Sequence, residues 1–295
     1  MAIYNYADQI KKSIDRLISQ EFDGKLMYQG REDEPYPSID KIKEFIELTR
    51  SVLFPGFFGN TSVNNTTLSY HMGVTIERIF QLLCEQLYAG ACFDCTDEER
   101  RLPEKKQKAM DMAATFIEHL PDIKLIVRTD VEAIYKGDPA AKNFGEIILA
   151  YPGIKAISNY RIAHELLTLG ASAIIPRIIT EMAHSETGID IHPGATIGKY
   201  FAIDHGTGIV IGETCIIGEH VKLYQGVTLG AKSFPTDDND EIIKGIERHP
   251  ILEDNVVVYA GATILGRITI GKDSVIGGNT WVTQPVPAGT VHLKK

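Results

Sequence analysis

The chain has 295 residues, 44% of them hydrophobic and 23% charged, which is the composition of an ordinary soluble protein with room for two domains. Its 30 basic and 39 acidic side chains give a net charge of −9, which argues against a general nucleic-acid binder or a membrane-surface protein. No signal peptide or membrane-length apolar run is recognisable, and four cysteines indicate no disulfide framework, so we expect a cytoplasmic protein.

Residues 1–186 are predicted to form an α-helical domain. Ser38 is a candidate N-cap for a helix whose apolar residues follow at helical spacing. A second apolar stripe runs through residues 76–87 and is expected to end at Gly90, because glycine commonly terminates helices.

A third helix is predicted to begin at Thr96 and Glu99, which have the spacing of a capping box. Its apolar stripe continues to Pro121, where we expect it to stop. The apolar pattern predicts three more helices in this domain: residues 138–150, 153–169 and 172–185.

From Gly188 onward the pattern changes to a step of six residues. This period fits neither a helix nor a plain strand, but it suits a chain that winds as a three-sided prism with one short strand per side. We therefore predict that residues 187–295 form a parallel β-helix of about four to five coils. The residues expected to point inward and stack are Ile191, Ile197, Ile203, Ile209, Cys215, Val221 and Val227, then Leu252, Val258, Ile264, Ile270, Ile276 and Val282.

Residues 232–250 interrupt the six-residue step. They are too polar and aperiodic to form a wall of the prism, so they are predicted to project from it as a loop. Binding residues often concentrate on loops that a rigid scaffold holds in place.

Several polar residues lie within the apolar repeat. Asp190 and Asp204 are 14 residues apart, which places them on neighbouring sides of adjacent coils. His205, beside an aspartate, can act as a general base, and Arg248 offers a two-pronged contact for a carboxylate. Aspartates can hold an ammonium group, so this set suits an amino-acid substrate.

Structural roles are the alternative for these residues. Asp190 can satisfy the amides of a corner, and Asp138, which precedes a proline, is a natural helix N-cap. A zinc site is a further alternative, because His192, His205 and His249 could supply three ligands. The neighbouring arginine and aspartates disfavour it, so no metal site is predicted.

Six motifs occur in an order that closely resembles the serine O-acetyltransferases of the hexapeptide-repeat acyltransferase family. The resemblance covers residues 130–285 strongly and the preceding helices more loosely. The motifs are Asp138-Pro-Ala-Ala, Tyr160-Arg-Ile-Ala-His164, Asp190-Ile-His-Pro, Asp204-His-Gly-Thr-Gly-Ile-Val-Ile-Gly-Glu-Thr, Gln225-Gly-Val-Thr-Leu-Gly and Arg248-His-Pro.

The resemblance implies an α+β chain, with an α-helical N-terminal domain followed by a left-handed parallel β-helix. It also implies transfer of acetyl from acetyl-coenzyme A (CoA) to the hydroxyl of L-serine, the committed step of cysteine synthesis. By position, His205 matches the family's general base and Asp190 its dyad partner. The other matched positions are Asp138 and Asp204 for the serine ammonium, Arg248 and His249 for its carboxylate and the reacting region, and Gly230, Ala231, Ala260 and Gly278 for the acetyl-CoA groove.

The family also sets expectations about partners. Acetyl-CoA is a co-substrate and no permanently bound cofactor is expected, while a homotrimer or a dimer of trimers and inhibition by L-cysteine are. The chain ends without the isoleucine tail that docks into the O-acetylserine sulfhydrylase, so no stable complex with that enzyme is expected. Trp281 is expected to cap the last coil, with packing near the adenine end of the groove as the alternative, and Lys232, Lys244 or Arg267 are expected to supply positive charge for CoA.

Three alternatives to this function share the fold. One is an acetyltransferase that acts on a sugar or another hydroxyl acceptor, but a sugar would leave Asp138, Asp204 and Arg248 without charged partners. Another is a zinc hydratase. The third is a trimeric scaffold without activity, which predicts a broken dyad, whereas Asp190 and His205 are both present.

Overall fold

The computed structural model of the chain describes residues 6–19, 34–59, 63–95, 102–237 and 239–293. Internal contacts divide the chain into two compact units, residues 1–35 and 36–295. The first unit contains α1 (Ala7–Ser19), none of whose residues is buried. The second unit contains all the other described helices and strands.

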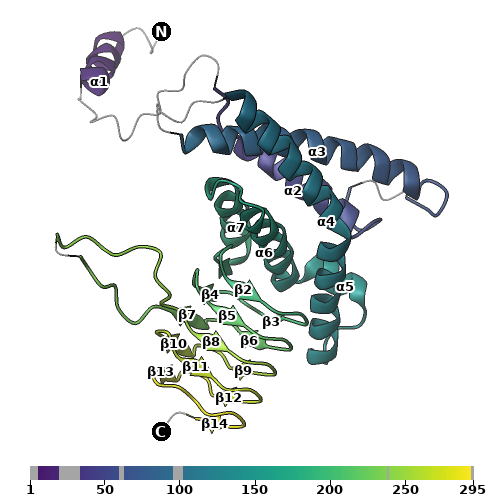
Figure 1. Cartoon of the computed structure of the whole chain (residues 1–295), viewed down its shortest axis with the longest axis vertical. Helices are drawn as coiled ribbons and strands as arrows, with labels where there is room; N and C mark the ends of the chain where they lie inside the picture. Colours follow the sequence, from purple (N-terminus) through teal and green to yellow (C-terminus); the bar gives the residue numbers. More distant parts are fainter. Residues whose placement is uncertain (1–5, 20–33, 60–62, 96–101, 238, 294–295) are drawn as a thin grey trace. The chain divides into compact units, whose positions relative to one another are not determined.

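In the described part of the second unit, the helices come before the strands (Figure 1). No described helix combines the length and the apolar character needed to cross a bilayer. The last helix ends at Thr187 and the first strand begins at Asp190. The helices are α2 (Ile39–Leu53), α3 (Leu68–Phe93), α4 (Leu102–Gly137), α5 (Phe144–Ala150), α6 (Pro152–Thr168) and α7 (Ile174–Thr187).

The predicted start of α2 is confirmed, whereas the predicted end of α3 is wrong. The Ser38 side chain accepts a hydrogen bond from the amide of Lys41 and caps α2. Helix α3 continues past Gly90 to Phe93. A Cβ at Gly90 would lie 2.9 Å from Cγ1 of Ile175, so this glycine allows α7 to pack closely rather than ending its own helix.

Helix α4 continues through Pro121, where the sequence predicted a stop. A proline inside a helix removes one backbone hydrogen bond, but packing on both sides compensates here. Phe116, Leu120 and Ile123 are all at most 4% exposed and hold the helix against its neighbours. The predicted capping pair at residues 96 and 99 lies outside the described residues.

Asp138 does not cap a helix, which corrects the prediction for residues 138–150. It follows the last residue of α4, and its Oδ1 accepts a hydrogen bond from the amide of Ala140 at 2.8 Å in a local turn. Helix α5 begins only at Phe144, where the side chain of Asn143 is the N-cap.

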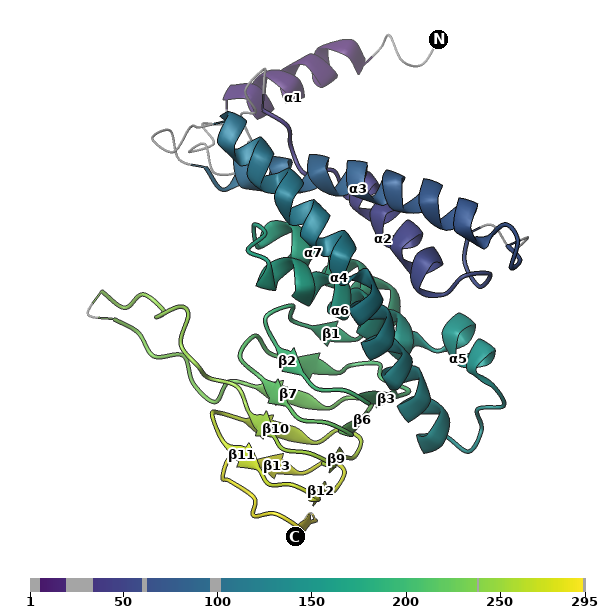
Figure 2. The ribbon, with the colours of Figure 1, turned by 45° about the vertical axis from the view of Figure 1, so that its right-hand side comes forward.

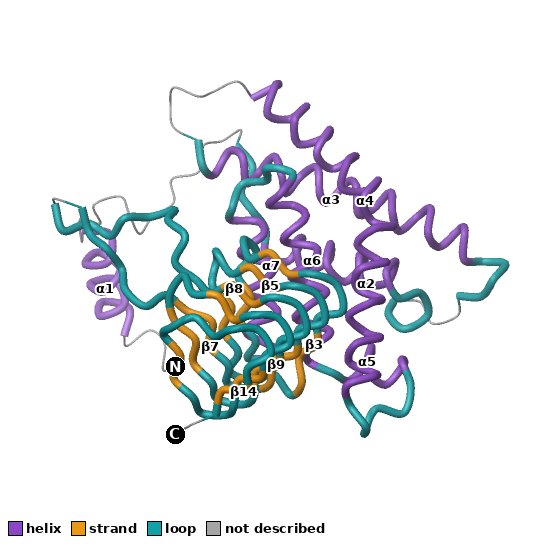
Figure 3. The backbone as a smooth tube through the Cα atoms, turned by 60° about the horizontal axis from the view of Figure 1, so that its bottom comes forward, coloured by secondary structure: helices purple, strands orange, loops and turns teal. Residues whose placement is uncertain are grey.

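The strands form a parallel solenoid with three faces, as the six-residue step predicted (Figures 1 and 3). In the described chain, face 1 is β1-β4-β7-β10-β13, face 2 is β2-β5-β8-β11 and face 3 is β3-β6-β9-β12-β14. The left-handed sense of winding stays a prediction. The bounds are β1 (Asp190–Ile191), β2 (Thr196–Ile197), β3 (Ala202–Asp204), β4 (Val210–Ile211), β5 (Ile216–Ile217), β6 (Lys222–Tyr224), β7 (Thr228–Gly230), β8 (Ile251–Leu252), β9 (Val257–Val258), β10 (Thr263–Leu265), β11 (Thr269–Ile270), β12 (Val275–Ile276), β13 (Trp281–Val282) and β14 (Val291–His292).

All thirteen predicted inward residues are buried, with exposed fractions of at most 5%. Their stacking partners differ from the prediction in the first coil. Asp190 pairs with Val210, 20 residues later, whereas Val210 pairs with Thr228, 18 residues later. Ile191 therefore stacks on Ile211 rather than on Ile209, because the corner between β3 and β4 contains two extra residues.

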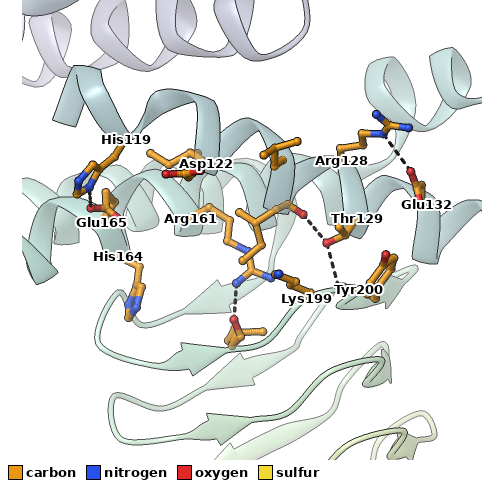
Figure 4. A pocket seen from close by; sticks show the side chains of 14 residues that line it. His119, Asp122, Arg128, Thr129, Glu132, Arg161, His164, Glu165, Lys199 and Tyr200 are labelled. Atoms are coloured by element: carbon orange, nitrogen blue, oxygen red, sulfur yellow. Dashed lines mark hydrogen bonds and ion pairs between the residues drawn. The ribbon is translucent and has the colours of Figure 1, made fainter. Parts of the chain in front are cut away.

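Helix α6 covers the open edge of the first coil (Figure 4). The hydroxyl of Tyr160 donates to the carbonyl of Ala195, Arg161 donates to the carbonyls of Ile197 and Gly198, and His164 donates to that of Pro193. Carbonyls at an open sheet edge otherwise lack partners. The Tyr160–His164 motif thus joins the helices to the solenoid.

Candidate active site

His205 lies at the longer corner between β3 and β4, where the chain passes from face 3 to face 1. Its φ is 59° and that of the following Gly206 is 94°. A Cβ at Gly206 would lie 2.5 Å from Cδ1 of Ile189, so only glycine fits there. This corner projects the imidazole outward, with 75% of the side chain exposed and Nε2 3.7 Å from Oδ1 of Asp204.

The carboxylates of Asp204 and Asp138 lie near His205 and share a cluster with a lysine. Lys222 Nζ is 2.8 Å from Oδ2 of Asp204 and donates to the carbonyl of Gly137, also at 2.8 Å. That carbonyl belongs to the residue before Asp138. Three residues that the sequence assigned to the serine site are therefore brought together at this corner.

The charge state of Asp138 is set by its neighbours. The hydroxyl of Tyr151 donates to Oδ2 of Asp138 at 2.7 Å and lowers the pKa of that carboxyl, with smaller contributions from the Ala140 amide, Lys222 and His205. The same hydrogen bond raises the pKa of Tyr151 to about 12. Asp138 is thus an anion, suited to an ammonium group.

Asp190 begins the strand that adjoins the His205 corner. Its amide donates to the carbonyl of Ile209 at 2.9 Å, so its backbone is bonded directly to this corner. Its carboxylate lies with Glu181 and His184, where the potential ligand atoms are within 4.8 Å of one another. None of the contacts between described residues joins Asp190 to His205, and the dyad stays a prediction.

Arg248 and His249 lie at the next corner of the prism, directly before β8, and they contact the corner between β4 and β5 in the coil above. Oγ1 of Thr214 accepts hydrogen bonds from both of their amides, at 3.0 and 3.1 Å. The Thr214 amide donates to Nδ1 of His249, which places the ring proton on Nε2. Arg248 also pairs with Glu213 at 2.9 Å.

His249 is only 7% exposed, and its imidazole packs against Gly212. A Cβ at Gly212 would lie 2.1 Å from Cδ2 of the ring, so the glycine makes room for it. Burial, with a smaller contribution from Arg248, lowers the pKa of His249 to about 4. The ring is therefore neutral at physiological pH.

The two clusters lie on opposite edges of face 1. Four residue steps of strand separate Gly208, at the end of the His205 corner, from Gly212, on which His249 packs, which is about 13 Å of extended chain. This backbone separation is longer than a serine molecule. For the same reason, His205 is apart from His192 and His249, so the three histidines considered as zinc ligands do not gather.

The four residues predicted for the CoA groove also flank face 1. Ala260 and Gly278 lie on the same corner as His205 in lower coils; a Cβ at Gly278 would be 3.0 Å from the carbonyl oxygen of Ala260. Gly230 and Ala231 lie at the end of β7, where the connection that returns to the prism at His249 begins. The groove role of these residues stays a prediction.

A long segment connects β7 to β8, at the residues for which a projecting loop is predicted. It leaves the prism between β7 and β8 (Figure 2), and Thr236 pairs with Ile242 across it. Arg267, one of the residues suggested for CoA, instead anchors the loop base: it pairs with Glu247 at 3.1 Å and donates to the carbonyls of Thr214 and His249.

Trp281 does not cap the last coil as expected. Its side chain is 69% exposed on face 1, while Val282 fills the inward position of the same strand at 3%. Side chains alternate along a strand, so an inward Val282 requires an outward Trp281.

A pocket of about 760 Å³ lies between α4, α6 and the first coil (Figure 4). Several of its charged side chains have partners: His119 pairs with Glu165, Arg128 with Glu132, and Arg161 donates to the first coil. None of the predicted site residues lines it. This pocket is distinct from the two corners.

Sequence reasoning missed the side chains that hold the site in place. Thr214 and Glu213 lie inside a motif that carried the resemblance, but no role was assigned to them. Tyr151 and Lys222 had no signal, because neither lies in a quoted motif or at an inward position of the repeat.

Comparison with known proteins gives the family of this chain. Residues 249–284 match the family model described as bacterial transferase hexapeptide (six repeats). The plasmid serine acetyltransferase of Synechococcus elongatus is 47% identical over 283 residues, which cover 94% of this chain and 88% of the relative. The chain belongs to the serine acetyltransferase family.

Solved structures of this family extend the likeness. Serine acetyltransferase isoform 3 of Entamoeba histolytica, in complex with cysteine, is 32% identical with a TM-score of 0.72, covering 97% of this chain and 90% of that one. A serine acetyltransferase in complex with CoA is 25% identical with a TM-score of 0.53, covering 85% of this chain and 94% of that one. The family assignment makes this chain an acetyl-CoA-dependent serine acetyltransferase.

Proposed function

We propose that the chain transfers acetyl directly from acetyl-CoA to the hydroxyl of L-serine, with His205 as general base. His205 takes the hydroxyl proton while the serine oxygen attacks the thioester carbonyl carbon. The tetrahedral intermediate then collapses, the carbon–sulfur bond breaks and the protonated His205 returns its proton to the CoA thiolate. The observation that carries this proposal is the exposed imidazole of His205 beside Asp138 and Asp204.

Asp190 is proposed as the partner that orients His205 and stabilises its imidazolium form. The support is the direct backbone bond between the Asp190 strand and the His205 corner. A carboxylate in this role fixes the tautomer of the base without taking up the proton itself.

The acceptor is bound, in this proposal, through its two charged groups. Asp138 and Asp204 hold the ammonium of serine, and Lys222 already shows that an ammonium fits beside Asp204, at 2.8 Å. Arg248 binds the carboxylate, with His249 beside it.

A covalent acetyl-enzyme is disfavoured. Cys215 is the cysteine of the solenoid, and it is 1% exposed. Burial raises the pKa of its thiol to about 12, so a thiolate nucleophile would not form at neutral pH. Direct transfer requires serine and acetyl-CoA to be bound at the same time.

The site is completed, we infer, by a second copy of the chain in a homotrimer. His205 and Arg248 lie on opposite edges of face 1, too far apart for one serine. Packing of prisms around a threefold axis would set the His205 corner of one copy against the Arg248 corner of the next. L-cysteine, which shares the ammonium and carboxylate of serine, is expected to compete for this site.

The first test is thiol release from acetyl-CoA with L-serine by the unmodified protein and by His205→Ala. We expect the variant to lose at least a hundredfold in kcat. His220→Ala is the matched control, because His220 also has a left-handed φ, of 58°, at a corner of the prism, away from the proposed serine site. Release of thiol with a sugar but not with serine would overturn the acceptor assignment.

The shared site is tested by mixing subunits. His205→Ala and Arg248→Ala are each expected to be inactive alone. After unfolding and refolding together, about a quarter of the interfaces would combine a native His205 with a native Arg248, and activity should return to that extent. If the mixture stays inactive although the trimers exchange subunits, the site lies within one chain.

A further inference from the structure

Trp281 is a large apolar side chain on the outer surface of the last coil. It is 69% exposed, whereas most aromatic side chains bury most of their area. It is also the single tryptophan of the chain. Trp281 does not pack in the prism core, so its exposed indole is available to bind a ligand.

Trp281 lies at the lower end of a straight column of outward side chains on face 1. The register of the sheet pairs each member with the one above it. The column begins at the proposed dyad residue Asp190 and ends at Trp281. From top to bottom it consists of Asp190, Val210, Thr228, Thr263 and Trp281.

The corner beside this column is a track of small residues that begins at the acetyl-transfer centre. Hydrogen bonds from Gly226 to Thr207, from Gly261 to Gln225 and from Asn279 to Ala260 join the corner from one coil to the next. Three coil steps of about 4.8 Å make the track about 14 Å long.

The two ends of this track are chemically different. The upper end carries His205, two residues before Thr207, where the thioester must lie. The lower end carries Gly278, and Trp281 follows three residues later. Gly226, Ala260 and Gly278 have at most a methyl side chain, which lets an extended chain approach the backbone at these points of the track.

We propose that Trp281 is the stacking platform for the adenine ring of acetyl-CoA. With the thioester at His205, an extended pantetheine arm follows the track downward and delivers the adenosine end of the molecule to the level of Trp281. This inference rests on the proposed function and adds the residue that recognises the nucleotide part of the donor.

Adenine is the occupant that the chemistry favours. Indole is the largest aromatic surface in proteins, and stacking of a nucleobase on an aromatic side chain contributes substantially to affinity without hydrogen-bond requirements. The rest of CoA, a flexible amide chain and phosphates, gains little from an exposed indole.

A fluorescence titration tests the contact without turnover. Because the emission of the native protein comes from one indole, CoA is expected to quench it saturably, whereas pantetheine, which lacks adenosine, leaves it unchanged. Calorimetry on the same samples measures CoA binding independently. Binding of CoA without quenching overturns the platform alone, and absence of CoA binding overturns the proposed function as well.

Kinetics with two donors tests what the contact contributes. Trp281→Ala should raise KM for acetyl-CoA roughly five- to a hundredfold with kcat and the KM for serine unchanged, and leave KM for acetyl-pantetheine as it was. Trp281→Phe should recover most of the affinity. Val291→Ala is the matched control, because Val291 is 64% exposed in the last coil but lies on face 3.

Two outcomes would show that Trp281 has a different role. An equal rise of KM for both donors would mean that the side chain supports the site as a whole. A smaller assembly of Trp281→Ala in size-exclusion chromatography would mean that the indole packs between copies of the chain. Either result overturns the adenine platform.

Discussion

The two corners of face 1 carry the two halves of the proposed serine site, but they hold their side chains in opposite ways. At the His205 corner the imidazole is 75% exposed and its neighbours are charged groups paired with each other. At the His249 corner the histidine is 7% exposed. Its imidazole accepts a hydrogen bond from the Thr214 amide and packs against Gly212. The exposed His205 is suited to exchanging a proton with the substrate, whereas the buried His249 is held neutral and fixed.

The backbone at the two corners explains how the same repeat holds one histidine exposed and the other buried. The His205 corner contains two extra residues and left-handed φ values, so its side chain stands away from the prism. The corner between β4 and β5 has the regular length, whereas the corner below it, between β7 and β8, carries the projecting loop, whose returning end places His249 against Gly212 of the coil above. A two-residue insertion exposes a side chain at one corner, whereas the returning end of a long loop buries one at the other.

The largest expected effect concerns the buried histidine and pH. The pKa of His249 is about 4 in the folded chain, below the usual 6.5, so the unfolded chain binds more protons between these values. The folding free energy contributed by the neutral ring is therefore present above pH 6.5 and is lost as pH falls toward 4, by up to about 3 kcal/mol.

Urea unfolding at pH 7.5, 5.5 and 4.5 checks this for the unmodified protein and for His249→Gln. We expect the variant to show a flatter pH dependence over this range. His205→Gln is the matched control and should keep the steep dependence, because its imidazole is exposed in the folded chain. Equal slopes for the protein and His249→Gln would contradict the burial argument.

A steric change at the second corner should weaken serine binding. Gly212→Ala places a Cβ 2.1 Å from the His249 ring, so the ring and the adjoining Arg248 must move. Loss of one charge-assisted contact to the substrate carboxylate should raise KM for serine roughly ten- to a hundredfold. Steady-state kinetics measures it.

The control for this change is Gly73→Ala. Gly73 lies in α3 and a Cβ there would meet no atom within 4 Å, so KM should not change. An unchanged KM for serine in Gly212→Ala would show that the second corner does not touch the acceptor.

The smallest effect is expected from a single hydroxyl at the first corner. The hydrogen bond from Tyr151 lowers the pKa of the Asp138 carboxyl. Tyr151→Phe removes this hydrogen bond, so the pKa of Asp138 should rise. We expect KM for serine to rise about fivefold and the acidic limb of the pH profile of kcat/KM to move to higher pH. Tyr135→Phe is the control, since its ring packs against Phe144, away from the site.

The repeat made the solenoid predictable, because every sixth position has the same environment in each coil. Burial of Ile191, Ile264 or Val282 follows from that rule alone. The stacking of Ile191 on Ile211 does not, since Ile209 is equally buried and the sequence shows no sign of which one is aligned. Helical ends were less predictable: tertiary packing carried α4 through Pro121 and α3 past Gly90.

The site likewise contains residues that the sequence identified and residues that only the folded structure reveals. His205, Asp204 and Asp138 were assigned through motifs, and the structure brings them together at one corner. Lys222 and Tyr151, which bind those carboxylates, could not be assigned. Lys222 reaches Asp204 from the neighbouring coil and Tyr151 reaches Asp138 across α5, and neither contact leaves a recognisable spacing in the sequence. The separation of Arg248 from His205 is likewise a property of the folded prism.

Because α6 covers the edge of the first coil, the coils of the prism have a preferred order of folding. Tyr160, Arg161 and His164 on α6 supply partners for carbonyls that no strand could satisfy, and they precede those carbonyls in the chain. During synthesis the helix emerges before the first coil, so we expect it to offer a template on which that coil forms. We then expect each coil to serve as the template for the next, so that the prism grows from its amino-terminal end.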